Sequence, residues 1–135
     1  MKIHPTVWLA PLVALMFQCQ SNPYQQGEIL YANFCANCHG VDGQGLQGLI
    51  PPLAAADYLQ EKRERLACII RYGLQDTIEV NGRTYGQVMT GIPELSETEI
   101  ANIINYIHHA WGNDFGYVPF DEVRRSLTGC EKNGR

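Results

Sequence analysis

The chain has 135 residues, a formal net charge of −4 and a hydrophobic fraction of 45%. This length accommodates one domain with one modest core, and the balance of apolar and charged residues excludes a disordered chain. The acidic excess disfavours nucleic acid and acidic substrates as partners.

Residues 1–19 have the pattern of an export signal. Lys2 precedes an apolar run from Thr6 to Phe17 that only Pro11 interrupts. This run is shorter than the ~20 apolar residues that span a bilayer, and it suits the central region of a signal peptide. A buried helix or a membrane anchor is the alternative. We expect export, and loss of the leader would leave nine of the ten basic residues against all fourteen acidic ones.

A cysteine closes the apolar run. Cys19 precedes the polar residues 20–23, which resembles the lipidation boundary of a bacterial lipoprotein, although residues 15–18 fit that family's small-residue pattern poorly. We expect lipidation at Cys19, so that the exported protein is periplasmic and held at the membrane by its lipid. An uncleaved or unlipidated leader is the alternative.

Cys35, Cys38 and His39 form a Cys-x-x-Cys-His motif. Two thiols at this spacing can add to the two vinyl groups of a haem, and the adjacent imidazole can meet the iron from below the ring. The alternatives are a thioredoxin-type redox pair and half of a zinc site. The first needs a βαβ context, whereas this pair ends a helical stretch and precedes glycines. The second needs two further ligands, and the adjacent His108 and His109 lack the required spacing. The motif therefore predicts one covalently attached haem c.

Two amphipathic helices are expected to cross near this motif. The first presents Gly27, Leu30, Tyr31 and Phe34. The second follows a capping box at residues 96–99, presents Ile100, Ile103, Ile104, Ile107 and Trp111, and ends at Gly112. Gly27 leaves room for a close crossing, and His108 and His109 are expected at the surface. Taken alone, the two helices would form an ordinary helical core.

In order and spacing, these features resemble class I cytochromes c over about residues 24–112. The shared features are Gly27, Tyr31, residues 35–40, Gly43-Gln44-Gly45, Pro51-Pro52-Leu53, Met89 and residues 103–107. The resemblance implies an all-α cytochrome c fold, with three to five helices around one haem. We expect this domain over residues 20–112, followed by a C-terminal extension over residues 113–135.

The resemblance also implies the two iron ligands. His39 would be the proximal ligand, with the Pro51 carbonyl accepting its other ring proton; alternatively, Pro51 only shapes the turn. Met89, the only methionine outside the leader, would be the sixth ligand, and its neutral thioether would favour Fe(II). The chain departs from the family's usual Met-Pro, because Thr90-Gly91 follows Met89, and this leaves the rigidity of the loop in question. A core methionine beside an open or His-filled iron site is the alternative.

A helix over about residues 58–72 and a small β-hairpin are expected between the motif and Met89. The segment 77–85 alternates around Asn-Gly, the strongest short hairpin signal. Lys62, Arg63 and Arg65 alternate with acidic residues, which predicts a solvated helix face. Tyr85 and Arg71 are candidates to hydrogen-bond the haem propionates; alternatively, they are exposed polar residues.

Cys68 and Cys130 complete the set of cysteines. An unpaired thiol is a liability in an oxidising compartment, so we expect a disulfide between them that ties residues 121–135 to the middle helix. Closing this loop would stabilise the fold by roughly 4 kcal/mol in the chain-entropy estimate. Two free thiols, with Cys68 buried, are the alternative.

These expectations together describe an exported carrier of single electrons. Its partners would be redox proteins: a donor dehydrogenase or quinol-oxidising complex, and an acceptor oxidase or reductase that docks transiently. The chain alone would transform no substrate. A tightly bound haem subunit of an oxidoreductase complex is one alternative. A haem sensor or peroxidase with a vacant sixth position is another, and Met89 discriminates against it.

Overall fold

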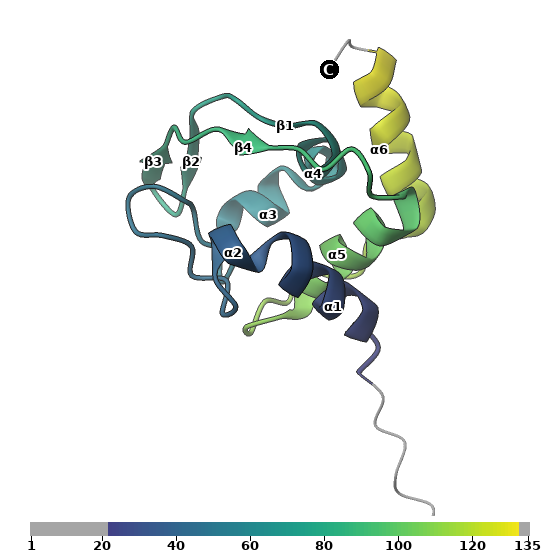
Figure 1. Cartoon of the computed structure of the whole chain (residues 1–135), viewed down its shortest axis with the longest axis horizontal. Helices are drawn as coiled ribbons and strands as arrows, with labels where there is room; N and C mark the ends of the chain where they lie inside the picture. Colours follow the sequence, from purple (N-terminus) through teal and green to yellow (C-terminus); the bar gives the residue numbers. More distant parts are fainter. Residues whose placement is uncertain (1–21, 133–135) are drawn as a thin grey trace, which may run out of the picture.

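The structure is a computed structural model that describes residues 22–132 (Figure 1). The predicted leader and Cys19 therefore lie outside the described residues. The described chain forms six α-helices, one 3-10 helix and two separate two-stranded antiparallel sheets. This mainly helical architecture confirms the predicted fold class, and it includes a small hairpin before Met89. No helix within residues 22–132 has the length and apolar character needed to cross a membrane.

The elements follow one another along the chain. They are α1 (Gln25–Phe34), α2 (Ala36–His39), α3 (Asp57–Glu61), η2 (Arg63–Arg65), α4 (Leu66–Tyr72), β1 (Gly73–Leu74), β2 (Ile78–Val80), β3 (Arg83–Tyr85), β4 (Met89–Thr90), α5 (Glu97–His109) and α6 (Phe120–Lys132). In Figure 1, α1 lies across α5, and α6 rises beside α4 and α5.

The crossing of α1 and α5 is closest at Gly27. A Cβ at this position would overlap the carbonyl oxygen of Asn102 and lie 2.6 Å from the Cβ of Tyr106, so only glycine lets the two backbones approach this far. Helix α5 begins at the predicted capping box, where the Ser96 hydroxyl accepts from the Glu99 N–H and the Glu99 carboxylate accepts from the Ser96 N–H. The crossing predicted from the sequence is confirmed.

The middle helix is interrupted, so the expectation of one helix over residues 58–72 is wrong. Helix α3 ends at Glu61, Lys62 has φ −116° and ψ 28°, and one 3-10 turn precedes α4. In that turn, Arg63 donates to the Glu122 carboxylate at 2.8 Å and to the Tyr117 carbonyl at 2.8 Å. The solvated face expected here is therefore wrong at Arg63, which instead binds the C-terminal extension.

Two strand pairs lead up to and into the Met89 segment. Strands β2 and β3 form the predicted hairpin, in which Asn81 (φ 51°) and Gly82 (φ 72°) supply the two left-handed residues of a tight turn. Strand β1 pairs with β4 in the antiparallel register Gly73 to Thr90 and Leu74 to Met89. The sequence pattern did not predict this second pairing, because two-residue strands carry no periodicity.

The C-terminal extension folds back over the end of α5. Here the structure overturns the expectation that His108 lies at the surface, because His108 is 0% exposed. Its Nδ1 lies 3.0 Å from the Gly116 carbonyl oxygen, and its ring packs edge-on against Phe115. His109 is half-buried and stacks on Tyr24. Residues after α5 therefore bury a histidine that is not part of the predicted haem site.

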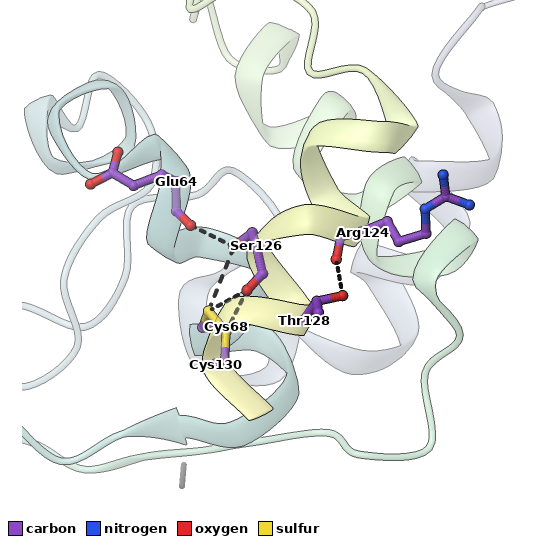
Figure 2. The surroundings of a disulfide bond; sticks show 6 residues. All are labelled: Glu64, Cys68, Arg124, Ser126, Thr128 and Cys130. Atoms are coloured by element: carbon purple, nitrogen blue, oxygen red, sulfur yellow. Dashed lines mark hydrogen bonds between the residues drawn. A yellow bond between two sulfur atoms is a disulfide. The ribbon is translucent and has the colours of Figure 1, made fainter. Parts of the chain in front are cut away.

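A disulfide joins α4 to α6 through Cys68 and Cys130, whose Cα atoms are 6.0 Å apart (Figure 2). Beside it, the Ser126 hydroxyl on α6 donates to the Glu64 carbonyl oxygen. The predicted pairing of Cys68 with Cys130 is present in the structure. It ties the extension to the middle of the fold.

Candidate functional site

An apolar cavity of about 500 Å³ occupies the space between the motif and the Met89 strand. In Figure 1, α2 and β4 lie apart, with α3 drawn between them. Among the described residues, the lining contains no lysine or arginine and a single carboxylate, that of Asp76. Leucine, isoleucine, valine and proline side chains form most of the wall. Such a space suits a large, flat, mainly apolar molecule with few polar groups.

The motif forms one wall of the cavity. Because α1 ends at Phe34 and α2 begins at Ala36, Cys35 and His39 are one helical turn apart, with the His39 N–H donating to the Cys35 carbonyl oxygen at 3.0 Å. Neither motif cysteine takes part in a disulfide; Cys35 is half-buried and Cys38 is exposed. Burial, with a smaller contribution from neighbouring Cys38, raises the pKa of the Cys35 thiol to about 11. The two thiols and the imidazole therefore face the cavity from one short segment.

The imidazole of His39 is buried and oriented by the loop that follows it. Its Nδ1 lies 3.2 Å from the Pro51 carbonyl oxygen, and Gly45 donates its N–H to the His39 carbonyl at 2.8 Å. Burial lowers the pKa of His39, and the contact with Pro51 opposes this only in part. A neutral ring that donates from Nδ1 keeps the lone pair of Nε2 available for a metal.

Met89 lies on β4 and lines the same cavity. Its side chain is half-buried, and its backbone pairs with Leu74. The structure thus brings His39 and Met89, which are fifty residues apart in the sequence, to one enclosed space.

Of the two residues predicted to contact the haem propionates, the structure places only one at the cavity. Tyr85 is 7% exposed and lines the cavity, whereas Arg71 is not part of the lining. The structure adds Tyr58, which lines the cavity and whose buried hydroxyl has no hydrogen-bond partner among the described residues. Sequence reasoning treated Tyr58 only as the start of a helix. No local pattern distinguishes a tyrosine that keeps an unpaired hydroxyl from one that reaches water.

The residues present fit a haem. The cavity is apolar, the paired thiols and an oriented imidazole share one wall, and a thioether is available on β4. An unpaired buried hydroxyl on Tyr58 fits a polar group supplied by a bound molecule, since buried polar atoms are rarely left without partners. A zinc site has no support in residues 22–132, where no three His, Cys, Asp or Glu side chains gather to bind a metal. The fold and the site are those of a small, mainly helical protein whose cavity fits a haem.

Comparison with known proteins places the chain in a family. Residues 24–111 match the model of the cytochrome c family. The chain is similar to cytochrome c-552 of Thermus thermophilus, with 42% identity over 108 residues that cover 73% of this chain and 82% of that protein. The chain therefore belongs to the cytochrome c family, a family of electron carriers whose members bind haem c covalently and are typically exported.

Other relatives are longer proteins, of which the chain matches only a part. The chain is 32% identical over 107 residues to the cytochrome c subunit of alcohol dehydrogenase (quinone) from Gluconobacter oxydans, covering 76% of this chain but 22% of that protein. It is 25% identical over 108 residues to the cbb3-type cytochrome c oxidase subunit FixP of Rhizobium meliloti, covering 34% of that protein. The domain thus also resembles modules within oxidoreductase subunits.

Proposed function

We propose that this protein carries single electrons between redox proteins through one haem c attached at Cys35 and Cys38, with His39 and Met89 as the axial ligands. The observation that carries the proposal is that His39 and Met89 line one apolar cavity. When bound, the haem supplies an iron that alternates between Fe(III) and Fe(II). The protein donates a nitrogen and a sulfur ligand to it, and a filled coordination sphere favours electron transfer over the binding of small molecules.

The surroundings of the two ligands set how readily the iron is reduced. Pro51 orients His39 and strengthens its donor character through Nδ1. Met89 offers a neutral sulfur that stabilises Fe(II), and the apolar wall disfavours the extra charge of Fe(III). Tyr58 and Tyr85 are the proposed hydrogen-bond donors to the propionates. Arg71 stays a prediction, since it lies outside the cavity lining.

An apolar collar at the cavity supports transient docking of redox partners there. The collar consists of Phe34, Leu46, Leu49 and Val88, which line the cavity and are each 48–54% exposed. A small apolar contact over the haem edge brings the iron close to a partner without a large permanent interface. We propose a dehydrogenase or quinol-oxidising complex as donor and an oxidase or reductase as acceptor. The names of the relatives, which include subunits of a quinone-linked dehydrogenase and an oxidase, support this class of partner.

The same collar favours a second candidate function, that of a tightly bound haem subunit. Size-exclusion chromatography of the native membrane or periplasmic fraction separates the two. A carrier elutes near its own mass, whereas a subunit co-elutes with its complex at every salt concentration.

We further propose that the leader exports the chain and that a lipid on Cys19 anchors it at the membrane. The mature wild-type protein should then partition into detergent and carry acyl mass at its N-terminus. Cys19→Ala should release it to the soluble periplasmic fraction. A Cys19→Ala protein that stays equally membrane-bound would remove the lipid as the anchor.

The test of the axial ligands is spectroscopic. A thioether on Fe(III) gives a weak near-infrared charge-transfer band, and we expect this band in the oxidised wild type together with slow CO uptake by the reduced form. Met89→Ala should abolish the band, open the iron to CO and lower the reduction potential. Val88→Ala, which truncates the neighbouring residue of the same wall, is the matched control and should keep the band. A wild type that lacks the band and binds CO at once would support the sensor or peroxidase alternative instead.

A further inference from the structure

The strand that carries Met89 lies directly against the C-terminal end of α4. Leu74 and Gly73 pair with Met89 and Thr90, and the Ile92 N–H donates to the Ile70 carbonyl oxygen at 2.9 Å. Backbone contacts therefore hold the strand at Met89 itself and over the three residues that follow it. We call this arrangement, made of residues 70–74 and 89–92, the methionine clamp.

The clamp is closed by a very short approach between two backbones. A Cβ at Gly91 would lie 2.5 Å from the Tyr72 carbonyl carbon, 2.6 Å from the Arg71 carbonyl oxygen and 2.6 Å from the Gly73 nitrogen. All three atoms belong to backbone, which cannot move aside as a flexible side chain does. A Cβ at Gly73 would in turn overlap the Met89 carbonyl oxygen. Each strand thus needs a glycine at the point of contact.

The two glycines are required for different reasons. Gly73 has φ 85°, so a side chain there would be strained as well as crowded. Gly91 is absent from the residues with positive φ, so close approach alone requires glycine at this position. Substitution of Gly91 therefore tests the clamp without altering a left-handed turn.

The other side of α4 is held in place by the C-terminal extension. Cys68, in the middle of α4, is bonded to Cys130, and Ser126 binds the Glu64 carbonyl just before α4 (Figure 2). Arg63 adds its ion pair to Glu122 at 2.8 Å. The extension thus anchors the first half of α4 and the turn before it, while the Met89 strand packs against the C-terminal end of the same helix.

We propose that Gly91 and Gly73 are positioning residues that set the place of the Met89 sulfur through the methionine clamp. This inference rests on the proposed function, because it concerns Met89 as a ligand. The proline that usually follows the ligand methionine stiffens its loop, and here Thr90-Gly91 stands in its place. Pairing with β1 and close packing on α4 supply the rigidity that proline would otherwise give.

The experiment compares Gly91→Ala with Gly86→Ala in the haem-loaded protein. Gly86 lies three residues before Met89, also without a positive φ, and a Cβ there would meet only the Thr77 hydroxyl at 3.4 Å. Gly91→Ala should weaken or abolish the near-infrared sulfur band, speed CO uptake by the reduced form roughly tenfold or more, and lower the reduction potential. Gly86→Ala should match the wild type in all three measurements.

The outcomes separate this inference from the proposed function. A wild type without the sulfur band refutes Met89 ligation itself. A wild type with the band, together with a Gly91→Ala protein that keeps both the band and the slow CO uptake, overturns the clamp alone.

Amide hydrogen exchange of the wild type covers the case in which Gly91→Ala fails to fold. The clamp requires the Ile92 N–H to be protected to the same order as the amides of buried α5, such as that of Ile104. Exchange as fast as that of exposed Gly82 would overturn the proposal.

Discussion

The crossing of α1 and α5 brings two helix backbones together at Gly27, whereas the region between α2 and β4 contains a cavity of about 500 Å³. At the crossing, Tyr31 is 2% exposed and its ring packs against that of Tyr106. Around the cavity, side chains of similar apolar character line a space that fits a large apolar molecule. Apolar side chains therefore form a packed core in one region and the walls of a binding cavity in the other.

The two regions are stabilised in different ways. Helix packing stabilises the crossing from within the chain, because burial of apolar side chains drives it. The side chains of the cavity wall are stabilised by burial only when a large apolar group fills the space. The crossing should thus tolerate changes at the haem site better than the cavity region does.

Removal of haem attachment should have the largest effect on this contrast. A bound haem would fill this cavity and give its apolar walls the packing partners of a core, so its loss should remove much of the stability of the fold. Cys35→Ala/Cys38→Ala should yield colourless protein without cooperative unfolding, while wild-type haem survives SDS and acidified organic extraction. Far- and near-ultraviolet circular dichroism checks this. If the double variant unfolded like the wild type, the stability of the cavity region would not depend on bound haem.

Removal of the disulfide should have the next largest effect. The bond closes a loop with a sequence separation of 62, so Cys68→Ser/Cys130→Ser should lower the free energy of unfolding by roughly 4 kcal/mol. Denaturant titration of the haem-loaded protein measures this loss, with each single Cys→Ser variant as a comparison. Wild-type protein should show no alkylation of either thiol after denaturation without reductant. Labelling of both thiols under those conditions would show that the bond is absent in solution.

An added methyl group at the crossing should have a smaller effect. Gly27→Ala places a Cβ onto the backbone of Asn102 and against Tyr106, and overpacking of this kind costs ~1–3 kcal/mol. Thermal unfolding should show a lower Tm with an unchanged near-infrared band, since the crossing does not touch Met89. Gly129→Ala is the matched control: a Cβ there meets nothing within 4 Å, and alanine is the better helix former. Equal Tm shifts for the two variants would contradict the close crossing.

The smallest effect should be a dependence of stability on pH through His108. Burial, opposed in part by the Gly116 carbonyl and reinforced by Arg63, lowers the pKa of His108. The unfolded chain therefore binds a proton near pH ~6.5 that the folded chain does not, and stability falls as the pH drops below that value. His108→Asn, whose amide can still donate to Gly116, should reduce this slope in denaturant titrations from pH 7 to pH 5. Glu122 on α6 interacts with both His108 and Arg63, so its own lowered pKa belongs to the same pH-dependent group.

Several features of the molecule could be predicted because their causes lie within a few residues. Cys35, Cys38 and His39 lie within about one helical turn, so their spacing alone predicts that they face one ligand. The capping box at Ser96 and the Asn81-Gly82 turn are equally local, and both are present in the structure. The disulfide was predicted by a different route, from the number of cysteines in an exported chain.

Other features could not be predicted, because they depend on segments far apart in the sequence. His108 was expected at the surface, and it is buried because residues 113–119 fold across the end of α5. Arg63 was assigned to a solvated face, and it binds Glu122 on α6 instead. Neither segment carries a pattern that reveals its partner.

The sequence by itself determined the chemistry of this protein: a covalent haem motif, one available methionine and the helices that flank them. The tertiary structure decided how that chemistry is held. Only folding brings Met89 to the cavity of His39, pairs its strand with β1 and buries the Tyr58 hydroxyl in the cavity wall. The physical reason is that covalent motifs and caps are set by neighbours along the chain, whereas burial and strand pairing are settled by contacts across it.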